Sequence, residues 1–217
     1  MTNRDGLPLK PEDGWIFRIM HVSNVGAVLD RGVLCRNGAD EDSGYTAIGS
    51  LDLIDHRWHH PVPCPPGGEL GDYVPFYFTP HSPMFYSIHT GKGVQKQANA
   101  DIVILVTQLR RVIDHQCRVL FTDRAAHLEA AQYYDDLNHL VDLPWEAFRT
   151  RNFRKDPENP DHFERYRAEA LVHRQLPVDA LRAIACYTEE VESRVKRQVD
   201  DRGLRLQVIL RPEWYFS

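Results

Sequence analysis

The chain has 217 residues and a formal net charge of -5, and 42% of its residues are hydrophobic. This length fits one domain, or at most two, with enough apolar side chains for a core. The negative net charge excludes a uniformly basic nucleic-acid-binding protein. No apolar run approaches the ~20 residues that a membrane-spanning helix needs, and the N-terminus lacks the apolar core of a signal peptide. We therefore expect a cytoplasmic protein without a membrane contact.

The four cysteines follow no Cys-x-x-Cys spacing, which argues against a zinc ribbon or a redox pair. They are Cys35, Cys64, Cys117 and Cys186. We expect free thiols in small core positions, as in a protein of a reducing compartment.

Residues 1–14 are polar and contain proline, so we expect a flexible lead-in before a single domain over residues 15–217. The domain begins with residues 15–21, whose aromatic and β-branched side chains are typical of a strand. Ser23 is placed to cap a following helix, and Gly32 is placed to end it. The first unit is therefore predicted to be a strand, a turn and a helix.

Histidines stand out at two places in this part of the chain. His21 lies at the first turn, where its ring either bonds a ligand hydroxyl or caps the turn. His56, His59 and His60 end a predicted short helix that starts near residue 51. Adjacent histidines rarely satisfy tetrahedral ligand spacing, and nearby aspartates complete no familiar ligand pattern, so we expect no metal.

Residues 61–68 are too rich in proline and glycine for regular structure, and an aromatic strand over residues 73–78 follows them. Pro75 limits the pairing of this strand, as at an edge or a bulge. A short helix is predicted over residues 82–91, with Ser82 as its cap. Nine of the fourteen residues from 73 to 86 are aromatic or proline. They form either plain core or the wall of a pocket for a flat ring.

The rest of the chain mixes strands and helices without regular alternation. Strands are predicted over residues 101–106, 118–122, 170–172, 184–187 and 204–210, and helical segments over residues 107–113, 123–139, 143–148, 178–183 and 189–201. The helix over 123–139 is expected to bury Ala126, Ala130, Tyr133, Tyr134 and Leu137. An aromatic tail over residues 212–216 is expected to pack against the domain. This order predicts an α+β fold.

A single carboxylate, Glu169, stands where a polar stretch turns into the apolar strand over residues 170–172. Residues 154–162 before it form a charged loop broken twice by proline. A carboxylate on a rigid strand edge beside a mobile basic loop is a good place for a reaction. The alternative is a strand-end charge that faces water.

The charge around Glu169 differs from that of the whole chain. Residues 149–174 contain seven Lys or Arg and five Asp or Glu, a net charge of +2. Such a patch either contacts phosphates or is a solvated loop of mixed charge.

Several stretches together resemble the DarT family of DNA ADP-ribosyltransferase toxins. They occur in the family's order and span nearly the whole chain. The most specific are the aromatic strand with Ser-Pro-Met-x-Tyr and the Ala-Glu-x-Leu-Val segment around Glu169. The matching stretches are residues 16–24, 57–63, 73–78, 82–86, 121–123, 167–172 and 212–215. Met20, His59 and His60 depart from the family pattern, and these departures leave the choice of base open.

The resemblance implies an ADP-ribosyltransferase fold with a split β-sheet core, NAD as co-substrate and no metal. It implies transfer of ADP-ribose to a base in single-stranded DNA, most often thymidine, with guanosine used by a related branch. It also implies a toxin with a cognate macrodomain antitoxin, and we expect a monomer. Two alternatives stay open: the same chemistry on RNA or protein, and a non-catalytic module that binds nucleic acid or NAD.

The resemblance also assigns roles to residues. Glu169 stabilises the positive charge that builds on the ribose as the nicotinamide leaves, and Arg57 positions the acceptor base and stabilises its anion. An arginine is a poor general base because it stays protonated. The residues expected to line the NAD pocket are His21, Asn24, Tyr77, Ser82, Met84 and Tyr86. The residues expected near the DNA are His127, Arg154, Lys155, Arg165 and Arg167. Core packing and helix capping are the alternatives for the pocket residues.

Overall fold

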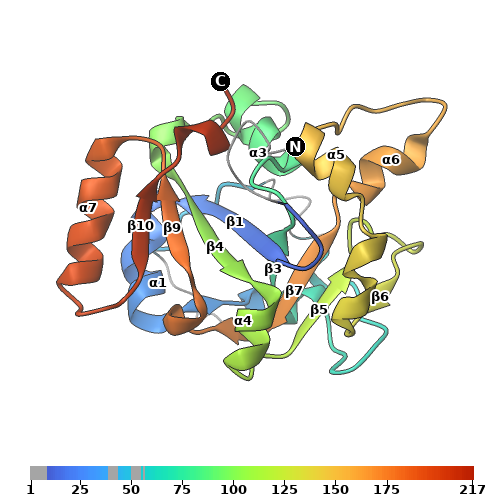
Figure 1. Cartoon of the computed structure of the whole chain (residues 1–217), viewed down its shortest axis with the longest axis horizontal. Coiled ribbons are helices and arrows are strands. Elements are labelled where there is room, and N and C mark those ends of the chain that lie inside the picture. Colours follow the sequence, from blue (N-terminus) through green and yellow to red (C-terminus); the bar gives the residue numbers. More distant parts are fainter. Residues whose placement is uncertain (1–8, 39–43, 50–54, 56) are drawn as a thin grey trace.

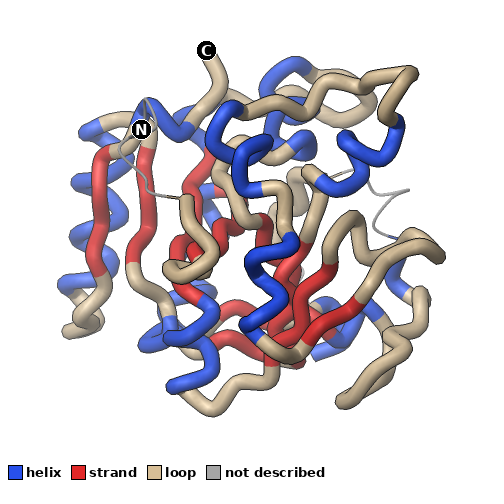
Figure 2. The backbone as a smooth tube through the Cα atoms, turned by 45° about the vertical axis from the view of Figure 1, so that its right-hand side comes forward, coloured by secondary structure: helices blue, strands red, loops and turns tan. Residues whose placement is uncertain are grey.

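The computed structural model describes residues 9–38, 44–49, 55 and 57–217. Figure 2 shows strands through the middle of the molecule, with short helices and long loops around them. Among the residues that the structure describes, no helix combines the length and the apolar character needed to cross a membrane. All four cysteines carry free thiols, as predicted.

One eight-stranded sheet has the order β10-β9-β4-β1-β3-β7-β5-β6 (Figure 1). The strands β2 and β8 pair separately. Among the strands that the structure describes, only β9 and β10 pair in parallel. The predicted α+β fold is confirmed. The strands are β1 (Trp15–His21), β2 (Val33–Leu34), β3 (Tyr73–Tyr77), β4 (Ile102–Gln108), β5 (Val119–Thr122), β6 (Tyr133–Tyr134), β7 (Glu169–His173), β8 (Gln175–Leu176), β9 (Ala183–Cys186) and β10 (Gln207–Leu210).

The sheet is split between β1 and β3, which pair only at Phe17 and Tyr77. We call β10-β9-β4-β1 the first half-sheet and β3-β7-β5-β6 the second half-sheet. Pro75 was expected to place β3 at an edge or a bulge; β3 lies inside the sheet, so the edge position is wrong. The carbonyl of Pro75 faces β1, because it accepts a hydrogen bond from Nη1 of Arg18 at 2.9 Å. A strand residue turns its N–H and C=O to the same side, so the proline's missing N–H also faces the split.

The helices are short and cover the sheet from several sides. They are α1 (Val25–Arg31), α3 (Pro83–Thr90), α4 (Leu109–Asp114), α5 (Trp145–Thr150), α6 (Pro160–Arg165) and α7 (Glu189–Asp200). The 3-10 turns are η1 (Val22–Asn24), η2 (Arg36–Gly38), η3 (Leu70–Asp72), η4 (Asn99–Asp101), η5 (Leu137–Asp142), η6 (Val178–Ala180) and η7 (Pro212–Trp214). The predicted cap of α3 is confirmed, since Oγ of Ser82 accepts from the backbone N–H of Phe85 at 3.2 Å.

The core centres on β4, in which the first six residues are all buried. The predicted stop of α1 at Gly32 is confirmed, with φ of 77°. A Cβ there would lie 2.5 Å from the carbonyl oxygen of Leu176, so no larger residue fits. The aromatic tail packs down as expected. Its Tyr215 hydroxyl donates to the carbonyls of Ile102 and Ala185 and so ties β4 to β9.

Residues 123–139 were predicted to be helical, and this prediction is wrong. They form an irregular loop, β6 and the start of η5. Oδ1 of Asp123 accepts from the N–H of Gln132 at 3.0 Å, and the Tyr133 hydroxyl donates to the carbonyl of Ala126 at 2.7 Å. These side chains bond backbone groups that a helix would use itself. Ala126 is buried as expected, but Ala130 is exposed.

Two smaller differences concern segments near the charged residues. The stretch 154–162 was predicted to be a loop, but α6 begins within it at Pro160, where a proline at the first turn favours a helix. The start of the predicted short helix, residues 51–54, lies outside the described residues. Asp55, Arg57 and Trp58 are helical.

Candidate active site

Glu169 begins β7, and its side chain is only 2% exposed. Oε2 accepts a hydrogen bond from Nη2 of Arg57 at 2.7 Å, and Oε1 accepts from the backbone N–H of Ala126 at 3.1 Å. The alternative that this carboxylate faces water is therefore wrong. A buried carboxylate needs such partners, because removing its charge from water is costly.

The backbone of Glu169 is fixed as well. Its N–H donates to Oγ1 of Thr122 at 3.2 Å, and the Thr122 hydroxyl donates to the carbonyl of Arg124 at 2.6 Å. Thr122 ends β5, the neighbouring strand of the second half-sheet. The end of β5 thus holds the main chain of Glu169, and the loop after β5 holds its side chain.

Arg57 reaches Glu169 from a short helical turn, with 21% of its side chain exposed. The next residue anchors this turn. Nε1 of Trp58 donates to Oδ1 of Asn37, and the guanidinium of Arg36 lies 3.8 Å from the centre of the Trp58 ring. Burial alone would lower the pKa of Arg57, but the charge and hydrogen bond of Glu169, together with Tyr77 and Tyr133, outweigh burial and raise the pKa. Arg57 is therefore a permanent cation beside the carboxylate.

Two tyrosines complete the surroundings of the pair. Tyr77 of β3 is the cross-strand partner of Glu169, and Tyr133 of β6 bonds the carbonyl of Ala126. Burial first, and then the charge of Glu169, raises the pKa of both phenols. Both hydroxyls are therefore neutral donors near physiological pH.

This arrangement suits the stabilisation of a developing positive charge. A carboxylate has about four acceptor positions, and the two hydrogen bonds to Glu169 leave acceptor capacity for a substrate hydroxyl. Preorganised charge in a buried site stabilises a transition state more strongly than it would in water. The adjacent Arg57 cation can stabilise a second reacting group on which negative charge develops.

The residues expected at the NAD pocket divide into two groups. His21 ends β1, and its Nδ1 lies 2.7 Å from Oγ of Ser23, so the ring does cap the turn. Asn24 is buried, and both ends of its amide bond the backbone of Thr46, each at 2.9 Å. Any ligand contact by Asn24 would have to replace one of these bonds.

The second group lies on or before α3. Ser82 is buried as the helix cap, and Met84 is half-buried. Tyr86 is 42% exposed, and its ring meets the rings of Phe153 and Phe216 at centroid distances of 5.6 and 5.3 Å. Tyr86 therefore already has an aromatic cluster around it. Of the predicted pocket residues, only Tyr77 lies beside Glu169 in the sheet register.

The residues expected near DNA differ in how firmly they are held. Arg165 donates to the carbonyl of Asp142, and Arg167 pairs with Glu164 at 2.7 Å. Arg154 and Lys155 are exposed, and neither pairs with a carboxylate in the described part of the chain. Lys155 lies over the ring of Phe163, with its Nζ 5.3 Å from the ring centre.

His127 follows Ala126, the residue whose N–H bonds Glu169. The sequence also allowed it to be a surface residue of a helix, but residues 123–139 contain no α-helix. His127 is half-buried in the loop beside the carboxylate. The described residues contain no group of three or more side chains that would hold a metal, and His59 instead bonds Glu69 at 3.0 Å. His56 lies outside the described residues.

Three residues of the site were missed from the sequence: Thr122, Ala126 and Tyr133. Ala126 acts through its backbone, so its side chain carries no signal. Tyr133 was taken for a core position of a helix that does not form. Thr122 lies inside one of the family-like stretches, which is the signal that would have found it.

Comparison with known proteins gives a family match over residues 17–216, to the family described as "DarT: ssDNA thymidine ADP-ribosyltransferase, DarT". An Escherichia coli O127:H6 protein, a "DNA ADP-ribosyl transferase", is 43% identical over 210 residues, which cover 96% of each chain.

Solved structures of DarT and DarTG proteins are also similar to this chain. Thermus sp. 2.9 DarT in complex with ADP-ribosylated ssDNA has a TM-score of 0.86 at 31% identity and covers 95% of this chain and 98% of its own. Its complex with NAD+ has a TM-score of 0.81 and covers 95% and 99%. Thermosipho africanus DarTG in complex with ADP-ribose shares the fold, with a TM-score of 0.74 at 19% identity. That match covers 93% of this chain and 51% of the other.

Proposed function

The chain belongs to the DarT family of ssDNA thymidine ADP-ribosyltransferases, and from this membership we infer that it transfers ADP-ribose from NAD+ to thymidine in single-stranded DNA. The buried ion pair of Glu169 and Arg57 at 2.7 Å supports the assignment of this activity to these two residues. A charged pair inside the sheet of an enzyme of this family is placed for chemistry, because simple stability favours apolar residues there.

We assign to Glu169 the stabilisation of the ribose. The bond between nicotinamide and C1′ of the ribose breaks, nicotinamide leaves with the electron pair, and the sugar becomes cationic. Oε1 and Oε2 of Glu169 offer negative charge to that sugar and accept a hydrogen bond from its 2′-hydroxyl. The interaction grows as the bond breaks, so it accelerates the reaction and does not only bind substrate.

We assign to Arg57 the positioning of the acceptor. A thymine ring nitrogen must lose its proton to attack C1′, and the base then carries negative charge that the guanidinium stabilises. Because Arg57 stays protonated, the proton passes to another acceptor, such as solvent. The permanent charge of Arg57 also fixes the orientation of the Glu169 carboxylate before substrate arrives.

We propose that NAD binds along the split between the half-sheets, with Tyr77 beside the nicotinamide ribose, Met84 on the pocket wall and His21 at the far end of β1. Asn24, Ser82 and Tyr86 act mainly through structure, since Asn24 and Ser82 use their polar atoms within the protein and Tyr86 packs among aromatic rings.

We propose that the strand of DNA runs over the segment from 149 to 167, with Arg154 and Lys155 on its phosphates. The target base reaches the site unpaired, because a base inside a duplex cannot reach a buried carboxylate. His127 lies on the loop that the flipped base would pass.

We further propose that residues 15–217 form one catalytic domain preceded by a lead-in over residues 1–14, that the enzyme acts as a monomer without a metal in the cytoplasm, and that a cognate macrodomain antitoxin reverses the modification. The family resemblance supports the antitoxin, and the likeness to Thermosipho africanus DarTG supports the shared fold.

The test is to incubate the protein with NAD+ and single-stranded oligonucleotides that each contain one kind of base, and to measure their masses. Oligonucleotides with thymidine are expected to gain one ADP-ribose, and nuclease digestion is expected to release ADP-ribosylated thymidine. Modified guanosine would overturn the choice of base. ADP-ribose on protein or RNA, but not on DNA, would overturn the substrate class.

A further inference from the structure

A hollow of about 400 Å³ lies between α4, η6 and the segment that joins α7 to β10. We call it the α4 hollow. Its polar walls are Arg111, His115, Asp179 and Arg205, and the rest of its lining is mostly valine and leucine. None of these residues belongs to the Glu169 site, and all come from elements around the first half-sheet.

The two arginines of the α4 hollow lack a carboxylate partner within the described part of the chain. Some arginines elsewhere do have one, as in the pairs of Arg124 with Asp123 at 3.0 Å and of Arg202 with Asp30 at 2.6 Å, and others in the same part of the chain do not. The exposed Asp179 also lines the hollow, so its arginines and this aspartate sum to a formal charge of +1, against -5 for the whole chain.

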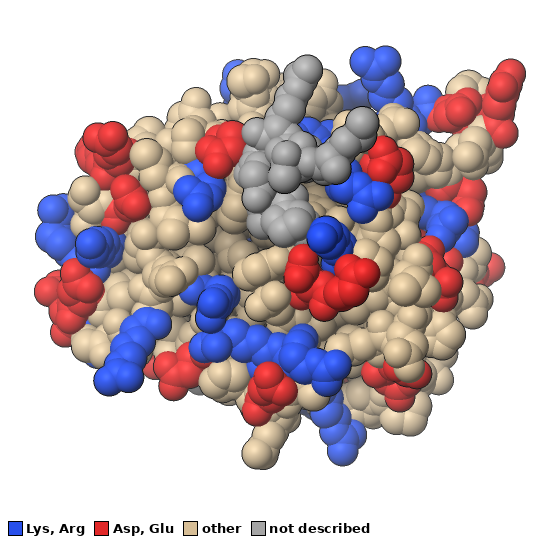
Figure 3. Space-filling view, viewed as in Figure 1, with Lys and Arg blue, Asp and Glu red and all other residues tan. Residues whose placement is uncertain are grey.

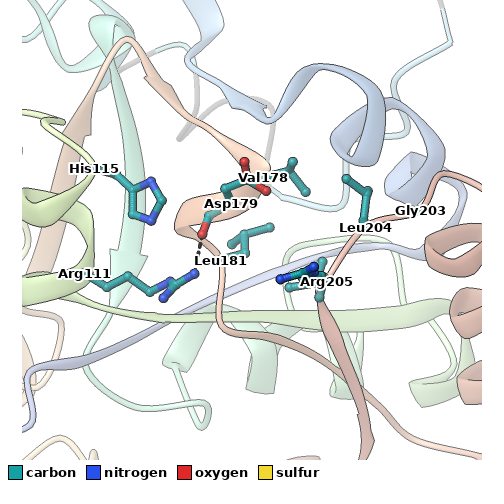
Figure 4. Close-up of a pocket in the computed structure, with 9 residues that line it drawn as sticks. Arg111, His115, Val178, Asp179, Leu181, Gly203, Leu204 and Arg205 are labelled. Carbon is teal, nitrogen blue, oxygen red and sulfur yellow. Dashed lines mark hydrogen bonds between the residues drawn. The ribbon is translucent and has the colours of Figure 1, made fainter.

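Arg111 is also held in place. One of its terminal nitrogens donates to the backbone carbonyl of Asp179, and its Nε is buried without a hydrogen-bond acceptor among the described residues. Figure 4 shows Arg111 and His115 on one side of the hollow and Arg205 on the other. Figure 3 shows Lys and Arg side chains gathered on the lower middle of this face, where Figure 1 places α4 and the nearby end of β4.

We propose that the α4 hollow binds a phosphate group, held between the guanidinium groups of Arg111 and Arg205 with His115 as a further ring donor. A guanidinium presents parallel N–H groups that match two phosphate oxygens. The apolar lining limits competition from water, and the volume fits a small ligand. The phosphate belongs either to the backbone of single-stranded DNA, outside the catalytic site, or to a free nucleotide.

The first experiment measures binding of inorganic phosphate by ³¹P NMR line broadening. It compares the wild type with Arg111→Gln/Arg205→Gln and with Arg110→Gln/Arg182→Gln. The second variant loses the same charge from exposed arginines outside the hollow. We expect the wild type and the control to bind phosphate and the lining variant to lose binding at least tenfold. Arg205→Gln alone, at an exposed position, gives the same direction without touching the buried part of Arg111.

The second experiment identifies the source of the phosphate. ADP-ribosylation of a short oligonucleotide of about five nucleotides and of one of about thirty is measured over a range of salt concentrations. If DNA is the source, the lining variant raises KM for the long oligonucleotide only, and the slope of log KM against log salt falls by roughly 0.7 per lost phosphate contact. If a free nucleotide is the source, both oligonucleotides keep their KM while phosphate binding is lost.

Equal phosphate binding by the lining variant, the control and the wild type would overturn the proposal. This result is distinguishable from failure of the proposed function, since transfer to the short oligonucleotide reports on the catalytic site alone. A lining variant that modifies the short oligonucleotide at the wild-type rate is folded, so loss of phosphate binding then reports on the α4 hollow.

Discussion

In the first half-sheet, β4 buries six successive residues and β1 pairs with it over its whole length, whereas the second half-sheet carries Glu169, Tyr77 and Tyr133. The first half-sheet is held by apolar packing and a regular backbone ladder. The second half-sheet also packs apolar residues, but it places a charged group at the start of β7 and surrounds it with a loop. The carboxylate that we propose for catalysis thus lies in the second half-sheet, although the strands of this half are also buried. Substitutions around Glu169 should affect rate more than stability.

Among these substitutions, Glu169→Gln is expected to lower the rate of transfer the most. It keeps the size of the side chain but removes the negative charge, so transfer to a thymidine oligonucleotide should fall by about 10²–10³-fold or more. The rate is measured from the mass shift under single-turnover conditions. Glu164→Gln, which removes a carboxylate from the same stretch of chain, is the control. Comparable rates for Glu169→Gln and Glu164→Gln would remove Glu169 from the mechanism.

Arg57→Ala comes next. It should retain NAD+ binding, because Arg57 is assigned to the acceptor, but transfer should fall by about 10²-fold, the size seen when one preorganised charge-stabilising donor is lost. Binding of NAD+ is measured by titration calorimetry and transfer by mass shift. Arg57→Lys keeps the positive charge but loses the planar guanidinium, so its rate of transfer should lie between those of the wild type and Arg57→Ala. Lost NAD+ affinity in Arg57→Ala would show that Arg57 belongs to the NAD pocket.

Tyr133→Phe tests the loop that positions the carboxylate. Losing the bond to the Ala126 carbonyl, worth about 1 kcal/mol, should lower kcat roughly fivefold through looser placement of Glu169. KM for NAD+ should stay the same. Tyr134→Phe is a matched control, because its ring stacks on Phe121 and lies on the same short strand. A purely structural role predicts equal losses of thermal stability and no selective change in kcat.

The smallest effect concerns stability at the far end of β3. Burial raises the pKa of Tyr73 to about 12, and its hydroxyl donates to the carbonyl of Gly67 at 2.7 Å. The pKa of Tyr73 in the folded protein lies above its value of about 10 in the unfolded chain. The stability that the neutral Tyr73 hydroxyl contributes is therefore full below pH 10 and is lost as the pH rises to about 12. Tyr73→Phe should therefore cost about 1 kcal/mol at pH 8, and much of that gap should close near pH 12.

The measurement for Tyr73 is urea unfolding at the two pH values, with Tyr45→Phe, at a 51% exposed position, as the control. A gap between Tyr73→Phe and wild type that is the same at both pH values would contradict the assignment. Transfer activity at neutral pH should be unchanged, since Tyr73 lies four residues along β3 from Tyr77.

The scaffold was largely readable from the sequence, because continuous apolar runs and helix caps are local signals. β4 and the cap of α3 at Ser82 were predicted from a few neighbouring residues. The site was not readable in this way. Arg57 and Glu169 lie 112 residues apart, and only the family resemblance brought them together. The loop after Thr122 was misread as a helix, because the long-range bonds that shape it leave no periodic pattern.

Pro75 gives the split between β1 and β3 a specific chemical cause. Continuing the register from Phe17 and Tyr77 would bring Ile19 opposite residue 75. Any other residue at position 75 would present a backbone N–H to β1. Two neighbouring strands with free backbone donors and acceptors tend to form hydrogen bonds with each other. Pro75 has no backbone N–H, so it cannot donate the next hydrogen bond to β1. Its carbonyl oxygen, which would accept the matching bond from β1, accepts instead from the side chain of Arg18. Replacing Pro75 should therefore let β1 and β3 pair further, and so narrow the space in which we propose that the dinucleotide binds.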